Sequence, residues 1–344
     1  MIPIDRGGGG YNPKTSNFPF WNLTVVLVAL VFVLTFSTAS ASAQAQRGTL
    51  VSDETIRVAP SADSAKIGEA GRGYELIIID SSRDWTHVEA ILRNPRQEEN
   101  DDDDENSGGK TITGWVLGKA LVSMTTPNGD KIVFGEAADS EDQASRRRGR
   151  RDAAQDAMRL YYRIYDLFPT SPLAGEGLYR AADIRWQMER SDVMTRPSAR
   201  ERDPYMRGQI GEEWMKLVIK KFPGTKWADL ASFHLIDNKL CGDWQGASRC
   251  PEKEADIYEK YVSEHEQSPA AAEALYDAAW RRAALIDIYK TEANQKKSEE
   301  AKGRALALAQ RIVTQYPQSD WSLRAQKLIF YIQQGVPTWG NTTD

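Results

Sequence analysis

The sequence predicts a multidomain protein in which a small β domain precedes an all-α domain of repeated helix pairs. Between residues 48 and 122, short runs of β-branched and aromatic residues alternate with turn clusters, which is typical of a small barrel. Between residues 153 and 335, apolar residues follow a helical period and one string of residues recurs. The 344-residue length also exceeds what one core usually supports. We therefore expect a β-barrel followed by an α-solenoid.

Composition and charge exclude two broad classes. With 41% hydrophobic residues, 10 Trp and 13 Tyr, the chain has enough apolar material to rule out global disorder. A formal net charge of -5 argues against a nucleic-acid binder, which usually has a basic domain.

Residues 1–43 are interpreted as an export signal. Residues 23–36 are uncharged and apolar, and the small residues Ala41 and Ala43 fit a cleavage site. The alternative is an uncleaved anchor, because residues 21–43 contain no charge and are long enough to span a bilayer. Either alternative places the remainder outside the cytoplasm, in the periplasm or an equivalent compartment.

Cys241 and Cys250 are the two cysteines of the chain, and a turn-rich segment separates them. Because an exported chain meets oxidising conditions, we predict a disulfide, with Cα atoms within about 7 Å. The spacing does not match the C-x-x-C pattern of redox-active pairs.

The β domain is assigned to residues 48–135, with five short strands expected in its first 75 or so residues. A turn at residues 127–130 is expected to lead into one more strand at residues 131–134. Closure into a barrel would remove exposed strand edges.

Several strings in this region resemble the bacterial SH3-like domain. They are Ile56-Arg57-Val58-Ala59-Pro60-Ser61, Lys66-Ile67-Gly68, Gly73, Trp85-Thr86-His87-Val88, and Gly114-Trp115-Val116. The resemblance implies binding of cell-wall peptides or protein partners, with Tyr74, Trp85 and Trp115 as the aromatic candidates. The alternative reading of the strand alternation places Trp115 in the barrel interior, where it would fill volume.

The chain departs from the family in a loop at residues 93–110, which holds seven carboxylates in eight positions. A calcium loop of the EF-hand type would need Glu at its twelfth position, but counting from Asp103 puts Gly114 there. We interpret the loop as solvated, with weak calcium attraction as the alternative, and predict no metal site.

Residues 136–152 are interpreted as a charged linker. They end in a run of cations: Arg146, Arg147, Arg148, Arg150 and Arg151. The alternatives are contact with anionic lipid or cell-wall polymers, and pairing with the acidic loop of the same chain.

The helical domain is assigned to residues 153–335, followed by a tail at 336–344. The string at residues 171–182 recurs at residues 268–279 with eight of twelve positions identical, and weaker copies begin at Thr225 and Ser319. Each copy opens with Ser or Thr, which is typical of a helix N-cap, and Pro follows in two of them. An aromatic or His residue precedes each copy and is expected to end the helix before it.

These helix pairs resemble tetratricopeptide repeats, with insertions at residues 190–207 and 241–251. The aromatic-Pro-x-Ser junctions resemble those of periplasmic repeat proteins of outer-membrane assembly and cell-envelope coordination. The resemblance implies protein binding on a concave face, for which Tyr162, Arg163, Arg281 and Arg282 are candidates because they lie off the apolar stripes. The alternative is that they are merely solvated.

No phosphate-binding, dinucleotide-binding or nucleophile-elbow motif is found, and the three histidines are widely separated. The sequence therefore predicts a non-catalytic, exported cell-envelope scaffold that binds proteins or peptides, with peptidoglycan as a further candidate ligand, and without cofactor or nucleic acid. The alternative is a peptidoglycan-hydrolase accessory subunit or an envelope enzyme.

Overall fold

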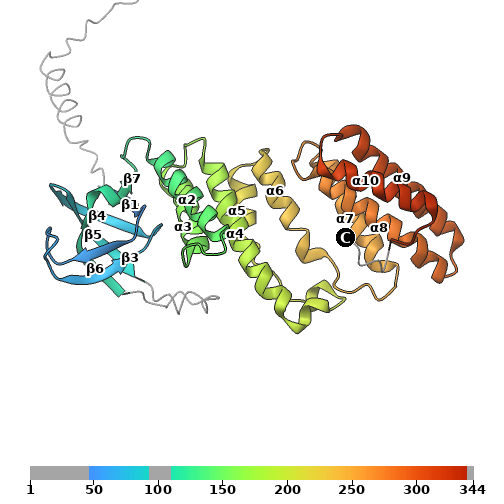
Figure 1. Ribbon diagram of the computed structural model, residues 1–344, viewed down its shortest axis with the longest axis horizontal. Coiled ribbons are helices and arrows are strands. Elements are labelled where there is room, and N and C mark those ends of the chain that lie inside the picture. The colour runs from blue at the N-terminus through green and yellow to red at the C-terminus, as the bar shows by residue number, and fades with distance from the viewer. Residues whose placement is uncertain (1–45, 93–109, 339–344) are drawn as a thin grey trace, which may run out of the picture. The chain divides into compact units, whose positions relative to one another are not determined.

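A computed structural model describes residues 46–92 and 110–338. The leader with Ala41 and Ala43, nearly all of the acidic loop and the last six residues lie outside the described residues. Within the described part, an antiparallel sheet precedes a succession of helices (Figure 1). The coarse expectation of a β domain followed by an α domain is therefore confirmed.

The sheet contains seven strands, all joined in antiparallel pairs. They are β1 (Gln46–Leu50), β2 (Glu54–Arg57), β3 (Lys66–Ala70), β4 (Glu75–Ser82), β5 (Trp85–Leu92), β6 (Lys110–Leu117) and β7 (Leu121–Ser123). Their order across the sheet is β3-β2-β6-β5-β4-β1-β7. The expectation of five strands was too low, because β1 and β3 contain glycines and charges that weaken strand propensity. Pairing with neighbouring strands supplies their backbone hydrogen bonds instead.

One face of the sheet forms a hydrophobic core. Leu50, Ile56, Leu76, Val88 and Val116 are fully buried, and they come from five different strands. Because successive strand residues point to opposite faces, Trp85, His87 and Trp115 lie on the other face. The alternation in β5 therefore predicted correctly that Val88 points into the core. The alternative that placed Trp115 in the interior is wrong, because Val116 occupies that position.

Residues 129–145 form a helix, α2 (Gly129–Ser145), which corrects two sequence interpretations. The strand expected at residues 131–134 and most of the linker expected at 136–152 are helical. Val133 and Ala137, one helical turn apart, are fully buried in a cluster that also contains sheet and helix residues. The charged residues of α2 occupy its remaining faces. Because so few residues of α2 are apolar, its sequence resembles a polar linker. The helix could be recognised only from the residues that Val133 and Ala137 pack against.

The other helices follow in chain order. They are α3 (Ala153–Leu167), α4 (Ala174–Thr195), α5 (Glu213–Lys221), α6 (Lys226–His234), α7 (Arg249–Glu264), α8 (Ala271–Thr291), α9 (Gln295–Gln315) and α10 (Asp320–Gln334). Most pack on the next helix in sequence, and α8 contacts α7, α9 and α10. Tyr161 of α3 lies in a core cluster with residues of α2 and α4, away from Ile312 of α9.

The junction residues end their helices as predicted. Phe168, Phe222, His265 and Tyr316 are the C-caps of α3, α5, α7 and α9, and each donates its backbone N–H to the carbonyl four residues earlier. Their side chains differ, but their backbone geometry is the same.

The helix starts agree only in part with the predicted N-caps. Thr225 caps α6, with its hydroxyl accepting from the Ala228 N–H. In contrast, α4 and α8 begin three residues after Ser171 and Ser268, whose hydroxyls accept from backbone N–H groups two residues on. These serines therefore fix a turn that precedes the helix, because a short side-chain hydroxyl competes with helical hydrogen bonding.

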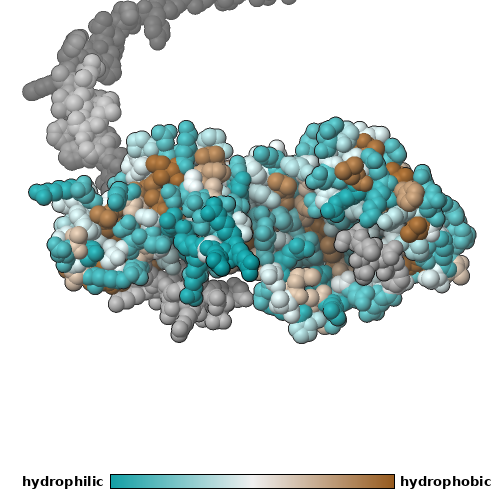
Figure 2. All heavy atoms as spheres, viewed as in Figure 1, coloured by the Kyte–Doolittle hydropathy of each residue, from teal (hydrophilic) through white to brown (hydrophobic). Residues whose placement is uncertain are grey.

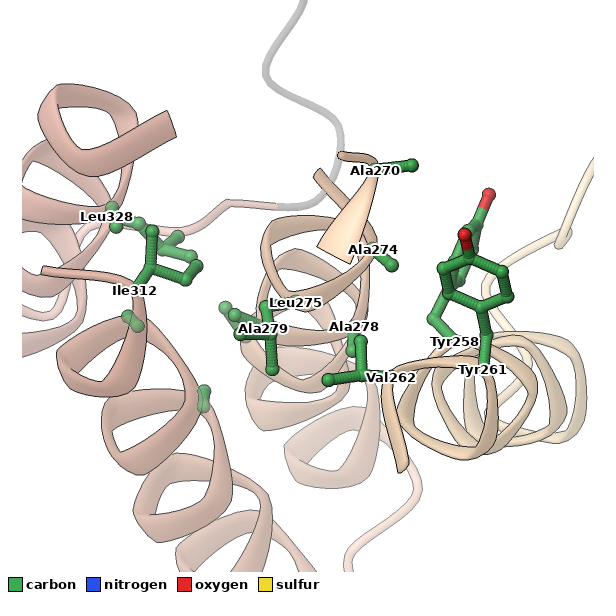
Figure 3. Close-up of a cluster of buried hydrophobic side chains, with 14 of the residues drawn as sticks. Tyr258, Tyr261, Val262, Ala270, Ala274, Leu275, Ala278, Ala279, Ile312 and Leu328 are labelled. Carbon is green, nitrogen blue, oxygen red and sulfur yellow. The ribbon is translucent and has the colours of Figure 1, made fainter. Parts of the chain in front are cut away.

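The core of the last four helices is built around α8. Leu275, Ala278 and Ala279 are fully buried, with Val262 and Tyr261 of α7 on one side and Ile312 and Leu328 on the other (Figure 3). Alanine occupies most of the α8 contact positions, because a small side chain lets neighbouring helices approach closely.

Cys241 and Cys250 form the predicted disulfide, with Cα atoms 6.1 Å apart. The pair closes the segment between α6 and α7 and packs with Trp244, Trp280 and Ile288. The insertion at residues 190–207 contacts this segment, since Gly242 donates its N–H to the Glu201 carbonyl at 3.1 Å.

Candidate functional site: an aromatic strip on the sheet

Three aromatic side chains form a strip on the outer face of β5 and β6. Trp85 and His87 are two residues apart on β5, and Trp115 lies directly opposite His87 on β6. The rings of His87 and Trp115 stack, with centroids 4.7 Å apart and planes inclined by 11°. All three side chains are half-buried. A partly exposed row of flat rings offers large contact area at small cost in side-chain entropy, which suits it to binding.

Polar groups flank this strip. Nδ1 of His87 lies 3.7 Å from a carboxylate oxygen of Asp80, and Arg57 of β2 is the strand partner of Trp115. The guanidinium of Arg57 donates to the Ser64 carbonyl at 2.7 Å. The Asp80 carboxylate and the Arg57 guanidinium thus border the rings, and together with the His87 imidazole they can supply hydrogen bonds to a polar ligand.

Tyr74, the third aromatic candidate, does not join this strip. The guanidinium of Arg159 on α3 lies over its ring, 4.9 Å from the centroid. Arg163 belongs to the same junction between sheet and α3. It donates to the Gly73 carbonyl at 3.1 Å, to Glu75 at 3.0 Å and to Asp166 at 2.8 Å. These two predicted site residues join the sheet to the helices.

Tyr162 packs between helices. Its ring centroid lies 4.9 Å from that of Trp214 on α5 and 6.0 Å from that of Tyr165. Burial raises the pKa of Tyr162 above its ordinary value, and the nearby Asp166 adds to this. The side chain is therefore a packing element between α3 and α5.

Arg281 and Arg282 are buried, which corrects the expectation that they lie off the apolar faces and available to a ligand. They are 8% and 5% exposed. Arg281 donates to Glu254 at 2.7 Å and to Asp277 at 3.2 Å, and Arg282 donates to Glu259 at 2.8 Å. Their partners come largely from α7, so the sequence of α8 alone could not show this pairing.

Glu254 is the centre of the buried cluster. It is 1% exposed and accepts from the Arg281 guanidinium, from the Cys241 backbone N–H at 2.9 Å and from the Trp244 indole at 3.1 Å. This carboxylate therefore ties the disulfide segment to α7 and α8. Sequence reasoning missed it, although a Glu four residues after a bonded Cys was an available signal.

A second polar cluster, also missed, joins α4 to the following helices. Tyr179, Asp183 and Trp186 share one face of α4. Nε2 of His234 lies 3.1 Å from Asp183 and 3.3 Å from the Tyr179 hydroxyl, while the Trp186 indole donates to Asp237 at 3.4 Å. The i, i+4, i+7 spacing of Tyr179, Asp183 and Trp186 could have predicted from the sequence that they share a face.

Two carboxyl groups of α8 have a pKa above its ordinary value. Burial raises the pKa of Asp277, which Arg281 partly offsets, and burial also raises the pKa of Glu273, with a further contribution from Asp277.

Each of the three histidines lies beside an aspartate: His87 by Asp80, His234 by Asp183 and His265 by Asp229. No group of three or more metal-ligating side chains occurs within the described residues.

The Arg146–Arg151 run divides in two. Arg146 pairs with Asp142, and Arg150 turns inward to Ser140 at 2.8 Å and Asp156 at 3.2 Å. Arg147, Arg148 and Arg151 remain exposed between α2 and α3.

Within residues 46–92 and 110–338, no helix combines the length and the apolar character needed to cross a bilayer.

Comparison with known proteins gives little. No family model matches the chain, and no curated protein matches it. Among solved structures, it is similar to a chain described as a DHF58 filament, at 14% sequence identity and a TM-score of 0.21. That match covers 60% of this chain and 91% of the other.

Proposed function

We propose that the protein is a non-catalytic, exported scaffold of the cell envelope. In this proposal an SH3-like β-barrel binds a cell-wall component or peptide, and tetratricopeptide-like helix pairs bind protein partners. The aromatic strip of Trp85, His87 and Trp115 is the observation that carries it, because half-exposed rings bordered by polar groups suit ligand contact.

Two packing features support the fold assignments within this proposal. The sheet core draws on β1 to β6, on Leu121 of β7 and on Ala120 just before it, which favours a strongly curved sheet. The helices run as consecutive packed pairs with aromatic or His C-caps at regular positions, which favours a repeat array.

The junction between sheet and helices supports a role in holding two ligands together. Val51 and Val122 share a hydrophobic cluster with Leu160 and Tyr161 of α3. Arg47 pairs with Glu75 of the sheet and donates to Asp166 of α3 at 2.6 Å. A ligand on the sheet is therefore held in a defined orientation relative to α3, as a scaffold requires.

A peptidoglycan sedimentation assay on the purified full chain tests the cell-wall half of the proposal. We expect co-sedimentation, and at least about fivefold weaker binding for Trp115→Ala, because an aromatic contact contributes roughly 1 kcal/mol. Ile91→Ala is the matched control, since Ile91 lies on the same face of β5 and is 54% exposed.

The same samples, assayed for soluble cell-wall fragments, separate scaffold from enzyme. We expect none to be released. Release of fragments by the chain alone would overturn the non-catalytic role and favour the envelope enzyme, and release only on addition of a hydrolase would favour an accessory subunit. Equal sedimentation of wild type and Trp115→Ala would remove the aromatic strip as the binding surface.

A further inference from the structure

Helix α6 leaves an open groove on its side toward the last four helices. It packs on α4 and α5 and approaches α7 and α8 at few points. Figure 2 shows the surface recessed, with apolar residues in the recess, between the middle helices and the last four. The ring of Phe233 on α6 lies 5.3 Å from that of Tyr261 and 6.2 Å from that of Tyr258 on α7, measured between centroids. Aromatic rings therefore line the bottom of the groove.

The Tyr258 hydroxyl has no hydrogen-bond partner among the described residues, although the side chain is only 4% exposed. Figure 3 shows Tyr258 and Tyr261 projecting from α7 in the same direction, past the side of α8 that carries Ala274. The Tyr261 hydroxyl donates to the Asp229 carbonyl at 2.9 Å and lies 2.6 Å from the Ser268 hydroxyl. Because a hydroxyl at this depth usually has a partner, the unpaired one at Tyr258 points to a ligand.

Three carboxylates lie within electrostatic reach of this hydroxyl or of one another. Asp237 belongs to the 3-10 helix η4 (Asp237–Lys239), and Glu273 and Asp277 lie one turn apart on α8. Burial raises the pKa of Tyr258, and the charges of Asp277 and Asp237 raise it further. Burial also raises the pKa of Glu273, to which Asp277 and Asp237 add. Since like charges at i and i+4 destabilise a helix, helix stability does not account for the α8 pair.

Two arginines partly balance Asp237 and Asp277. The buried Arg281 donates to Asp277 at 3.2 Å, but it lies closer to Glu254, at 2.7 Å. Nε of Arg190, whose side chain is 59% exposed, lies 3.4 Å from Asp237. Both carboxylates therefore share their cations with another carboxylate or with solvent.

Glu273 makes no hydrogen bond or ion pair among the described residues. His234 and Arg324 act on it from a distance, since His234 lies 3.1 Å from Asp183 and Arg324 lies over the Trp321 ring, 4.8 Å from its centroid. In this region carboxylates outnumber cations: Asp183, Asp237, Glu254, Glu273 and Asp277 against Arg190, Arg281, Arg324 and His234.

The cluster fits an organic cation better than a metal ion. Among the described residues, no three ligating side chains are placed to hold a metal. An ammonium on an alkyl stem would place its charge among the carboxylates and its stem against the rings of Phe233 and Tyr258. Small ligands need a pocket that encloses them, whereas this groove is open, so it suits a cation carried on a polypeptide.

We propose that the groove between α6 and α8 binds a lysine-bearing segment of a protein partner, whose ammonium group lies among Asp237, Glu273 and Asp277 and donates to the Tyr258 hydroxyl. An ammonium group has three donors and no acceptor, so it can satisfy the hydroxyl and two carboxylates together. This inference rests on the proposed protein-binding role of the helices and identifies the chemistry of the partner.

The probe is a labelled synthetic peptide of alternating Ala and Lys, measured with the full chain by fluorescence anisotropy. The control is the same peptide with every lysine acetylated, which keeps the stem and removes the charge. We expect the acetylated peptide to bind at least about tenfold more weakly. The free diamine cadaverine, added as a competitor, should displace the probe only at concentrations at least about tenfold above those of unlabelled peptide.

Two single variants test which groups bind the lysine. Tyr258→Phe removes the unpaired hydroxyl, and Glu273→Gln removes the unpaired charge. We expect each to weaken the lysine peptide at least about fivefold, because a hydrogen bond or charge pair to the ammonium is lost. The denaturation midpoint should stay the same or rise, since neither variant breaks a hydrogen bond or ion pair among the described residues.

Each variant has a matched control. Tyr261→Phe removes a hydroxyl that is bonded to Asp229 and Ser268, so it should lower the denaturation midpoint and leave peptide binding unchanged. Glu264→Gln makes the same charge change on α7, where the side chain is 56% exposed, and should leave peptide binding within about twofold.

Three results would overturn the proposal. They are equal binding of the lysine and acetylated peptides, full-strength binding by both Tyr258→Phe and Glu273→Gln, and displacement by cadaverine at the concentration of the peptide itself, which would make the ligand a small amine. Crosslinking to an envelope protein at full yield in both variants would leave the scaffold role standing and remove this groove as its site. Failure of both peptide binding and all crosslinking would remove both.

Discussion

Helix α7 carries two kinds of ion pair that differ in burial. On one side, Glu254 meets Arg281 of α8, with side chains 2% and 10% exposed. On another side, Glu252 and Glu259 of α7, together with Glu266 just beyond its end, meet Lys297, Arg304 and Arg311 of α9, each at a separation of 45 residues. The acidic and the basic residues are both spaced by seven residues, so the three pairs make a ladder that fixes the register of α7 and the junction after it against α9. The same kind of ion pair is therefore buried between α7 and α8 and exposed to solvent along α9.

Burial decides what each arrangement contributes to stability. Solvent screens the ladder, whose basic side chains are about a third to a half exposed, so each pair contributes roughly 0–1 kcal/mol. Loss of one partner from the buried pair leaves a desolvated charge, which typically costs about 3–5 kcal/mol. The following substitutions test this difference, from the largest expected effect to the smallest.

Leu275→Asp should have the largest effect. Leu275 is fully buried among apolar side chains of α7, α9 and α10, so Asp there would be a buried charge without a partner. We expect a loss of about 4 kcal/mol or more in the free energy of unfolding. Chemical denaturation measures it, and Leu323→Asp at a 70% exposed position is the control. Equal midpoints for the two variants would contradict the helix packing.

Glu254→Gln should cost about 3 kcal/mol, because Arg281 loses its closest carboxylate in a buried site. The same substitution on the same helix in the ladder, Glu252→Gln, should cost less than about 1 kcal/mol. Denaturation at low and high salt separates them further, since salt should weaken only the exposed pair. Similar losses in both variants would mean that burial does not distinguish the two kinds of pair.

Gly73→Ala should cost about 1–3 kcal/mol at the junction between sheet and α3. Gly73 has φ of +75°, and a Cβ there would lie 2.4 Å from the Arg159 Cβ and 2.9 Å from the Leu160 backbone N. Gly135→Ala in α2 is the control. It has open space and should stabilise by up to about 1 kcal/mol. Hydrogen exchange at the Arg163 and Asp166 amides should rise only in the first variant.

Arg304→Gln should have the smallest effect, a loss of no more than about 1 kcal/mol that disappears in high salt. A thermal melt in low and high salt is the measurement. A loss as large as that of Glu254→Gln would show that the ladder acts as a cooperative network.

The sequence was most informative where the signal is local. Strand alternation in β5, the C-caps Phe168 and Tyr316, and the Cys241–Cys250 pair all depend on residues near one another in the chain, and the structure confirms each. The candidate site was predictable in part. Trp85 and Trp115 share a face, whereas Tyr74 and Arg163 belong to the sheet–helix junction.

Tertiary structure alone decided the features whose partners are distant. Residues 129–145 are helical because Val133 and Ala137 pack on α3 and the sheet, and nothing in their polar composition indicates that contact. Arg281 is buried because Glu254, 27 residues away, balances its charge. The sequence by itself determined that a β domain precedes a helical domain, where four of the helices end, and the disulfide, because backbone propensity and short loops act locally. Which charges are buried, and which apolar face of α10 stays exposed, depended on where other elements pack, since burial is a property of the assembled fold.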